Sequence, residues 1–104
     1  MDTISPQEAY DILQQKGPAA VLIDVCTPDE FDDAHAEGAI SMPLNEVTMH
    51  VKDLEPYTDV LVICRLGMRS ATAAELLRAL GVKGEVRSVA GGLSAWHAEG
   101  LPIE

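Results

Sequence analysis

The sequence predicts an α/β fold in which a mostly parallel sheet carries helices on both of its faces. Two short apolar runs, residues 20–25 and 60–63, are rich in β-branched residues, as is typical of strands buried on both faces. Helix signals alternate with these runs, and that alternation indicates parallel βαβ units. The 104 residues contain no internal repeat and no Pro-, Gly- or Ser-rich linker, so we expect residues 1–104 to form a single domain.

Each element in the first half of the chain has its own signal. Ser5-Pro6-Gln7-Glu8 combines a capping box with a proline suited to the first helical position, which predicts a helix over residues 6–16. The strand at residues 20–25 follows it. Thr27-Pro28-Asp29-Glu30 repeats the helix-start pattern, and this second helix is predicted to end before Gly38. Residues 39–42 then form a short strand that stops at a proline.

The second half continues the alternation. Residues 44–54 carry apolar side chains at helical spacing, and residues 60–63 form the second buried strand. Residues 70–80 are strongly helical, and residues 85–89 form the last strand. A glycine turn leads into a short helix over residues 93–99. Active sites of open parallel sheets lie at the carboxyl ends of the strands, where this arrangement places Cys26 and Cys64.

Composition excludes several classes of function. The net charge is −10, from 7 Lys and Arg against 17 Asp and Glu, which argues against nucleic-acid binding through a broad basic face and against adhesion to an anionic membrane. No apolar run approaches the ~20 residues of a membrane span, and the first ten residues lack the pattern of a secretory signal, so a cytoplasmic location is expected. Two cysteines make no disulfide scaffold. No Cys/His spacing resembles a zinc site, and we expect neither a metal nor a cofactor.

The segment from residue 60 to residue 80 carries the chemistry. A buried strand delivers Cys64 to its carboxyl end, Arg69 follows five residues later, and a helix then begins. A tight loop at this place can turn successive N–H groups inward as an anion-binding nest, and Gly67 supplies the backbone freedom that the loop requires. The helix N-terminus, Arg65 and Arg69 add positive charge, which favours the thiolate of Cys64. The sequence therefore predicts a nucleophile inside an anion cradle.

The loop CRLGMRS at residues 64–70 resembles the active-site loop of the rhodanese sulfurtransferases. Three further signatures of that family have counterparts in the same order along the chain: LIDV with PDEF in residues 22–31, HAEGAI in residues 35–40, and GGLSAW with GLP in residues 91–102. The resemblance implies a three-layer rhodanese-like sandwich around a five-stranded sheet. It also implies the activity of a thiosulfate sulfurtransferase.

The resemblance further implies a role for each loop residue. Cys64 would attack a sulfane sulfur donor such as thiosulfate and become a persulfide, from which a thiophilic acceptor, cyanide in vitro, removes the sulfur. Arg65 and Arg69 are candidates to hold the anionic donor. Ser70 would cap the next helix or bond to the sulfur. The amides that would stabilise the persulfide belong to Leu66, Gly67, Met68 and Arg69.

The chain departs from the family pattern at Cys26. The family usually has Asp-Val-Arg where this chain has Asp24-Val25-Cys26. We interpret Asp24 as a structural carboxylate that binds nearby backbone N–H groups, and Cys26 as a small substitute for the arginine. A sharper alternative makes Cys26 a redox partner of Cys64, which requires Cα atoms within ~7 Å. The second signature also departs, with Ala34 and Ala36 flanking His35.

Other conspicuous residues are interpreted as structural. The histidines share no spacing with a carboxylate or cysteine and receive no catalytic role, and Trp96 is expected in the core. The acidic cluster at the second helix is expected to be a solvated helix face rather than a metal site. The residues concerned are His35, His50 and His97, and Asp29, Glu30, Asp32 and Asp33.

Three other functions compete with a small-molecule sulfurtransferase. Cysteine-dependent phosphatases and arsenate reductases have a Cys-to-Arg loop one residue longer than this one, which suits a tetrahedral oxyanion better. Non-catalytic modules of the family usually lack the cysteine that stands here as Cys64. A persulfide carrier would differ only in its acceptor, a partner protein whose surface we expect to be basic. The expected partners are a small anionic donor and, for a carrier, a protein acceptor, and we expect the chain to be a monomer or weak dimer.

Overall fold

The two apolar runs form the centre of the sheet. β2 (Ala20–Asp24) and β4 (Asp59–Ile63) lie side by side in parallel, and every residue of both is buried. The computed structural model describes residues 2–104, in which five strands pair in the order β1-β5-β4-β2-β3, all in parallel. β5 (Glu85–Val89) flanks β4, and the two-residue strands β1 (Thr3–Ile4) and β3 (Ile40–Ser41) form the edges. The α/β fold with a parallel sheet is confirmed.

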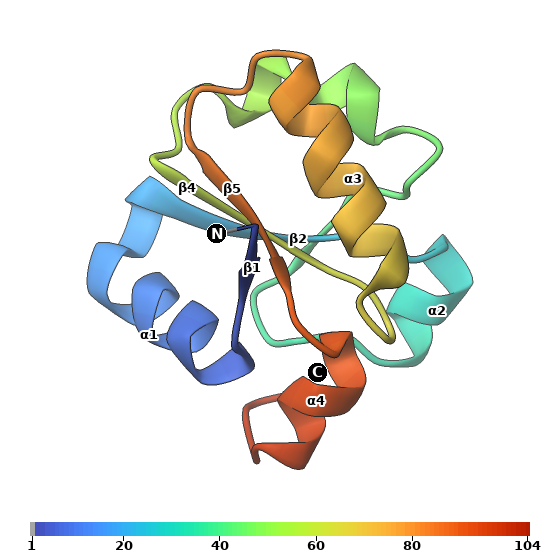
Figure 1. Ribbon diagram of the computed structural model, residues 1–104. Helices are drawn as coiled ribbons and strands as arrows, with labels where there is room; N and C mark the ends of the chain where they lie inside the picture. Colours follow the sequence, from blue (N-terminus) through green and yellow to red (C-terminus); the bar gives the residue numbers. More distant parts are fainter. Residues whose placement is uncertain (1) are drawn as a thin grey trace.

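Helices cover both faces of this sheet, as predicted (Figure 1). The long helix α3 (Met68–Ala79) shares one face with the 3₁₀ turns η2 (Val47–His50) and η3 (Lys52–Leu54), and its apolar cluster includes Val62 and Leu77. Helices α1 (Pro6–Lys16) and α4 (Gly92–Ala98) cover the other face, where fully buried Trp96 packs with Leu61. Side chains of β4 point alternately into these two clusters, because successive residues of a strand face opposite sides.

Capping explains where the first two helices begin. In α1 the Ser5 hydroxyl accepts a hydrogen bond from the Glu8 amide at 3.1 Å, and the Glu8 carboxylate accepts one from the Ser5 amide at 3.3 Å. The same reciprocal pair joins Thr27 and Glu30 at the start of α2 (Pro28–Asp33). Both predicted capping boxes are therefore confirmed. A 3₁₀ turn, η1 (Gly17–Ala19), connects α1 to β2.

Helix α2 ends at Asp33, before Gly38 as predicted, because Ala34 adopts an extended conformation and Ala36 then forms a bridge with Ile103. The helix predicted over residues 44–54 is wrong. Residues 44–54 form two 3₁₀ turns rather than one helix. Hydrogen bonds between residues three apart, such as that from the Met49 amide to the Glu46 carbonyl, replace the α-helical pattern there.

One strand and the first residue of one helix were not predicted from the sequence. β1 was not predicted, because two residues are too few to show a strand period, and it pairs with β5 at the edge of the sheet. Helix α3 begins at Met68 rather than at Ser70, with Gly67 as its N-cap residue. No helix among residues 2–104 is long and apolar enough to cross a membrane.

A buried carboxylate ties the amino end of β4 to its neighbours. The Asp59 side chain is 3% exposed, and it accepts hydrogen bonds from Lys16 Nζ at 2.5 Å, Thr58 Oγ1 at 2.8 Å and Arg87 Nη2 at 2.9 Å. Burial acts to raise the pKa of Asp59, but the bonds from Lys16 and Thr58 and the charge of Arg87 outweigh it, so the pKa lies below its ordinary value of 3.8. This cluster lies at the amino end of β4, whereas Cys64 follows the carboxyl end of the same strand.

We expect Asp59→Asn to lower the free energy of unfolding at pH 7 by about 2 kcal/mol, because Lys16 and Arg87 lose the charged acceptor of their hydrogen bonds. Because the folded-state pKa is depressed, Asp59 stabilises the fold above the unfolded-state pKa of about 4, and this contribution disappears as the pH falls through the folded-state value. Urea titrations at several pH values measure both effects. Asp32→Asn, at an exposed position of α2, is the control with the same change of charge. Equal stability of the two variants at pH 7 would contradict the prediction.

Candidate active site

Cys64 stands immediately after β4, at the carboxyl edge of the sheet. It belongs to the same apolar cluster as Val60 and Val62 of that strand, so its side chain points to the face that α3 covers. The residue is only 2% exposed. Cys64 therefore lies at the end of a strand, as predicted. Its thiol points into the loop rather than to solvent.

The loop between β4 and α3 wraps its N–H groups around this sulfur. Cys64 Sγ accepts hydrogen bonds from the Gly67 amide at 3.1 Å and from the Ser70 amide at 3.3 Å, and it lies 3.5 Å from Ser70 Oγ. Gly67 adopts φ +100°, a conformation that side-chain-bearing residues rarely adopt, and a Cβ there would also press on the Gly91 amide. A glycine at this position allows the chain to turn both N–H groups toward one atom.

Helix α4 holds the loop from behind. The Leu93 amide donates to the Cys64 carbonyl at 2.7 Å, and the Ser94 amide donates to the Arg65 carbonyl at 3.1 Å. These are free N–H groups of the first turn of α4, which have no partner within the helix. A Cβ on Gly92 would collide with the Cys64 carbonyl, so only glycine permits this approach. With its carbonyls engaged by α4, the loop presents amides to the sulfur.

The hydrogen bonds around the sulfur favour its anionic form. Burial acts to raise the pKa of Cys64, but bonds from the Ser70 hydroxyl and from the amides of Ser70, Gly67 and Leu66 outweigh it and lower the pKa below the ordinary 9.0. The start of α3 adds the partial positive charge of a helix N-terminus. A thiolate with a lowered pKa is the reactive form of a cysteine.

Both loop arginines are held by carboxylates of α2. Arg69 donates from Nη1 and Nη2 to the two oxygens of Glu30, at 2.7 and 3.1 Å. Arg65 donates to Asp33 at 3.3 Å. The Arg69 guanidinium is the main cause that lowers the pKa of Glu30 to about 2, and Glu30 in turn raises the pKa of Arg69.

The expectation of a solvated helix face is therefore wrong for half-buried Glu30, whereas Asp33 is exposed as expected and pairs with Arg65 at the surface. Their spacing of three residues places both on one side of α2, which was the signal available in the sequence. Asp29 and Asp32 are exposed. No group of three or more His, Cys, Asp or Glu suited to a metal ion occurs within residues 2–104.

Cys26 lies beside the Arg69 guanidinium. Arg69 Nη2 is 3.7 Å from Cys26 Sγ, and the Cys26 amide donates to Asp24 Oδ1 at 2.8 Å. Burial, followed by the hydrogen bond and charge of Asp24, raises the pKa of Cys26 to about 12. Cys26 and Cys64 are both buried free thiols in the same apolar cluster. Their environments differ in that Cys26 faces a carboxylate where Cys64 faces amides.

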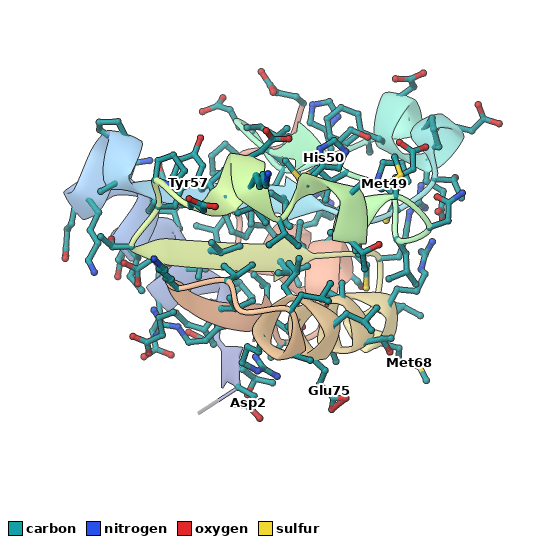
Figure 2. All side chains as sticks on the ribbon, turned by 90° about the horizontal axis from the view of Figure 1, so that it is seen from above. Asp2, Met49, His50, Tyr57, Met68 and Glu75 are labelled. Atoms are coloured by element: carbon teal, nitrogen blue, oxygen red, sulfur yellow. The ribbon has the colours of Figure 1, made fainter. Side chains whose placement is uncertain are left out.

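An open cavity of about 730 Å³ adjoins the loop. Its walls combine Arg65 and Arg69 with apolar side chains and one histidine, and the complete lining is Glu30, Ala34, Arg65, Leu66, Arg69, Leu93, Ser94, His97 and Ile103. Leu66 is 69% exposed and Met68 is 79% exposed, and Figure 2 shows Met68 extending away from the body of the protein at the start of α3. The rim of the loop is therefore apolar.

The structure also resolves the two roles open to Ser70. Because Gly67 is the N-cap of α3, the capping alternative is wrong, and the Ser70 hydroxyl instead lies between Cys64 Sγ, the Gly67 carbonyl and the hydroxyl of Ser88. Ser88 was not singled out from the sequence. It belongs to β5, and no local pattern connects it to a loop eighteen residues earlier.

Comparisons with known proteins agree with this geometry. The sequence model of the family described as Rhodanese-like domain matches residues 5–99. The chain is 37% identical over 101 residues to the thiosulfate sulfurtransferase GlpE of Vibrio cholerae, covering 97% of this chain and 92% of that protein. The NMR structure of the rhodanese-like domain of the Alr3790 protein from Anabaena superimposes with a TM-score of 0.87 at 30% identity, over 100% of this chain and 79% of that one.

A crystal structure of a rhodanese-related protein from Thermoplasma volcanium gives a TM-score of 0.84 at 31% identity, over 100% of this chain and 98% of that one. The five-stranded parallel sheet and the cysteine loop thus occur together with a sequence match that spans nearly the whole chain. On these grounds the chain belongs to the rhodanese-like domain family.

Proposed function

We propose that this protein is a thiosulfate sulfurtransferase that carries sulfur as a persulfide on Cys64, all within the single domain of residues 1–104. Membership of the rhodanese-like family and the sulfurtransferase relatives support sulfur transfer as the activity. The observation that carries the proposal is the position of Cys64 Sγ, 3.1 Å from the Gly67 amide and 3.3 Å from the Ser70 amide. Such a ring of donors stabilises a negative sulfur atom without any metal ligand.

The proposed cycle needs one nucleophile and two displacements. The Cys64 thiolate attacks the outer sulfur of thiosulfate and a new S–S bond forms. The S–S bond of the donor breaks, and sulfite leaves with its electron pair. Cyanide or another thiophile then attacks the outer sulfur of the persulfide, so that thiocyanate leaves and the Cys64 thiolate returns. The amides of Leu66, Gly67, Met68 and Arg69 are the proposed donors to the anionic persulfide.

Arg65 and Arg69 are the proposed binding groups for the anionic donor. Both line the 730 Å³ cavity beside the loop. Glu30 and Asp33 engage part of each guanidinium, and the buried Nε of Arg65 has no hydrogen-bond partner among residues 2–104. A guanidinium held from one side in this way is oriented before the substrate arrives. The site offers guanidinium donors at close range to an anion that the net charge of −10 repels at a distance.

A second candidate is a carrier that passes the persulfide sulfur to a thiol of a partner protein. The observation that favours it is the exposed apolar pair Leu66 and Met68 at the mouth of the loop. Large apolar side chains exposed together commonly mark a contact surface. The two candidates share the Cys64 persulfide and differ in the acceptor alone.

Incubation with thiosulfate should add one sulfur atom to the protein, visible in the intact mass after excess donor is removed. Cyanide should then remove that atom and release thiocyanate, because the outer sulfur of a persulfide is electrophilic. Cys64→Ser should gain nothing, whereas Cys26→Ser is the matched control and should gain the sulfur. Failure of the wild-type protein to gain sulfur from thiosulfate or from a second sulfane donor would refute the proposed activity.

The two thiols should differ in their reaction with iodoacetamide near pH 7. Cys64 should be alkylated much faster than Cys26, because amide donors lower the pKa of Cys64 while burial and Asp24 raise that of Cys26 to about 12. Peptide mapping by mass spectrometry after short exposures distinguishes the two sites. Equal rates would contradict the assignment of Cys64 as the nucleophile.

Arg69→Lys should raise the KM for thiosulfate by roughly 10-fold, because lysine keeps the charge but loses the fork that Glu30 orients. Thiocyanate formation at varied thiosulfate concentrations measures this change. Arg78→Lys is the matched control, since Arg78 lies in the last turn of α3 and donates to the Val86 carbonyl. An unchanged KM in Arg69→Lys would mean that the donor binds without Arg69.

A further inference from the structure

Behind the proposed nucleophile lies a pair of buried hydroxyl groups. Ser70 is 0% exposed and Ser88 is 2% exposed, and their Oγ atoms are 2.7 Å apart. Ser88 projects from β5 toward the face that α3 covers, as Val86 does two residues earlier. A buried donor without an acceptor is costly, so the direction of the hydrogen bond between the two hydroxyls matters.

The contacts of each oxygen assign those protons. Within residues 2–104, Ser88 Oγ has Ser70 Oγ as its sole hydrogen-bond partner. Ser70 Oγ has three neighbours, namely Ser88 Oγ, the Gly67 carbonyl at 3.1 Å and Cys64 Sγ at 3.5 Å. If Ser70 donated to Ser88, the Ser88 proton would have no acceptor. Ser88 therefore donates to Ser70, and the Ser70 proton is free for the other two neighbours.

The Ser70 hydroxyl then has two possible acceptors, and the protonation state of the Cys64 sulfur decides which one receives its proton. When Cys64 is a thiol, its S–H points to Ser70 Oγ and the Ser70 hydroxyl donates to the Gly67 carbonyl. When Cys64 is a thiolate, the Ser70 hydroxyl can rotate and donate to the sulfur. In both states the Ser88 hydroxyl occupies one lone pair of Ser70 Oγ, which makes Ser70 a stronger donor through hydrogen-bond cooperativity.

We propose that Ser88 is a positioning residue for Cys64, whose hydroxyl donates to Ser70 and so directs the Ser70 hydroxyl onto the thiolate. This proposal rests on the proposed function only in taking Cys64 as the reactive sulfur. The charged and titratable groups around the loop are Arg65, Arg69, Glu30 and Asp33 of α2, Asp24 and Cys26 at the end of β2, and His97 of α4. Variants of Ser70 and Ser88 leave all of them in place.

The test is the rate of alkylation of Cys64 by iodoacetamide as a function of pH, resolved by peptide mapping. Ser88→Ala should slow alkylation roughly 3-fold at pH values where wild-type Cys64 is mainly a thiol, and Ser70→Ala roughly 10-fold. At high pH, where every form is a thiolate, the rates should converge. The double variant Ser70→Ala/Ser88→Ala should react like Ser70→Ala, because Ser88 acts through Ser70.

Thr72→Ala is the matched control, because it removes a hydroxyl from the exposed side of α3 and should leave the profile unchanged. Circular dichroism and thermal unfolding verify that each variant is folded. A Ser88→Ala profile identical to wild type overturns the proposal, as does an effect of Ser88→Ala that persists in the Ser70→Ala background. Alkylation uses no sulfur donor, so a protein that fails to form a persulfide from thiosulfate still gives a decisive answer here.

Discussion

The backbone hydrogen bonds between the start of α4 and the loop after β4 are the constraint on which the site depends. They join the amides of Leu93 and Ser94 to the carbonyls of Cys64 and Arg65. A peptide unit that points its carbonyl one way points its N–H the other way, so engaging the carbonyls helps turn amides toward the sulfur. The Gly91-Gly92 turn, more than twenty residues from Cys64, therefore helps shape the cradle by letting α4 approach closely.

A second consequence of this geometry is the way charge is distributed at the mouth of the site. Two arginines lie on or beside the loop, and the two carboxylates that bind them belong to α2, the helix that follows β2, which is the strand next to β4 in the sheet. The charges of the two arginines and the two carboxylates cancel. The loop amides, rather than a net positive charge, therefore stabilise negative charge on the Cys64 sulfur. This balance also limits how strongly the proposed site can attract an anion, since each guanidinium is already partly occupied.

The two cysteines show how far the surroundings of a side chain decide its chemistry. Both follow buried central strands and both lie in one apolar cluster, yet their pKa values move in opposite directions. Amides and a hydroxyl surround Cys64. Asp24, in contrast, accepts a hydrogen bond from the Cys26 amide and places negative charge near the Cys26 sulfur. Burial alone would raise both pKa values, so the difference arises from the hydrogen bonds.

Local sequence determined the elements whose signals are themselves local. Both capping boxes, the two central strands, the order of strands and helices and the strand-end position of Cys64 follow from residues a few positions apart. The extents of α2 and of residues 44–54 did not follow, because the bridge between Ala36 and Ile103 and the 3₁₀ turns depend on packing partners. The two-residue strand β1 exists only because β5 pairs with it.

The candidate site divides in the same way. The loop residues from Cys64 to Ser70, including the need for a glycine within them, could be identified from the sequence. The partners of the loop could not, because Glu30, Asp33, Ser88 and Leu93 are distant in sequence and meet it only when parallel strands bring their carboxyl ends to one edge. The sequence by itself thus determined which sulfur is the candidate nucleophile. The tertiary structure decided its ionisation and surroundings, because long-range hydrogen bonds form only in the folded chain.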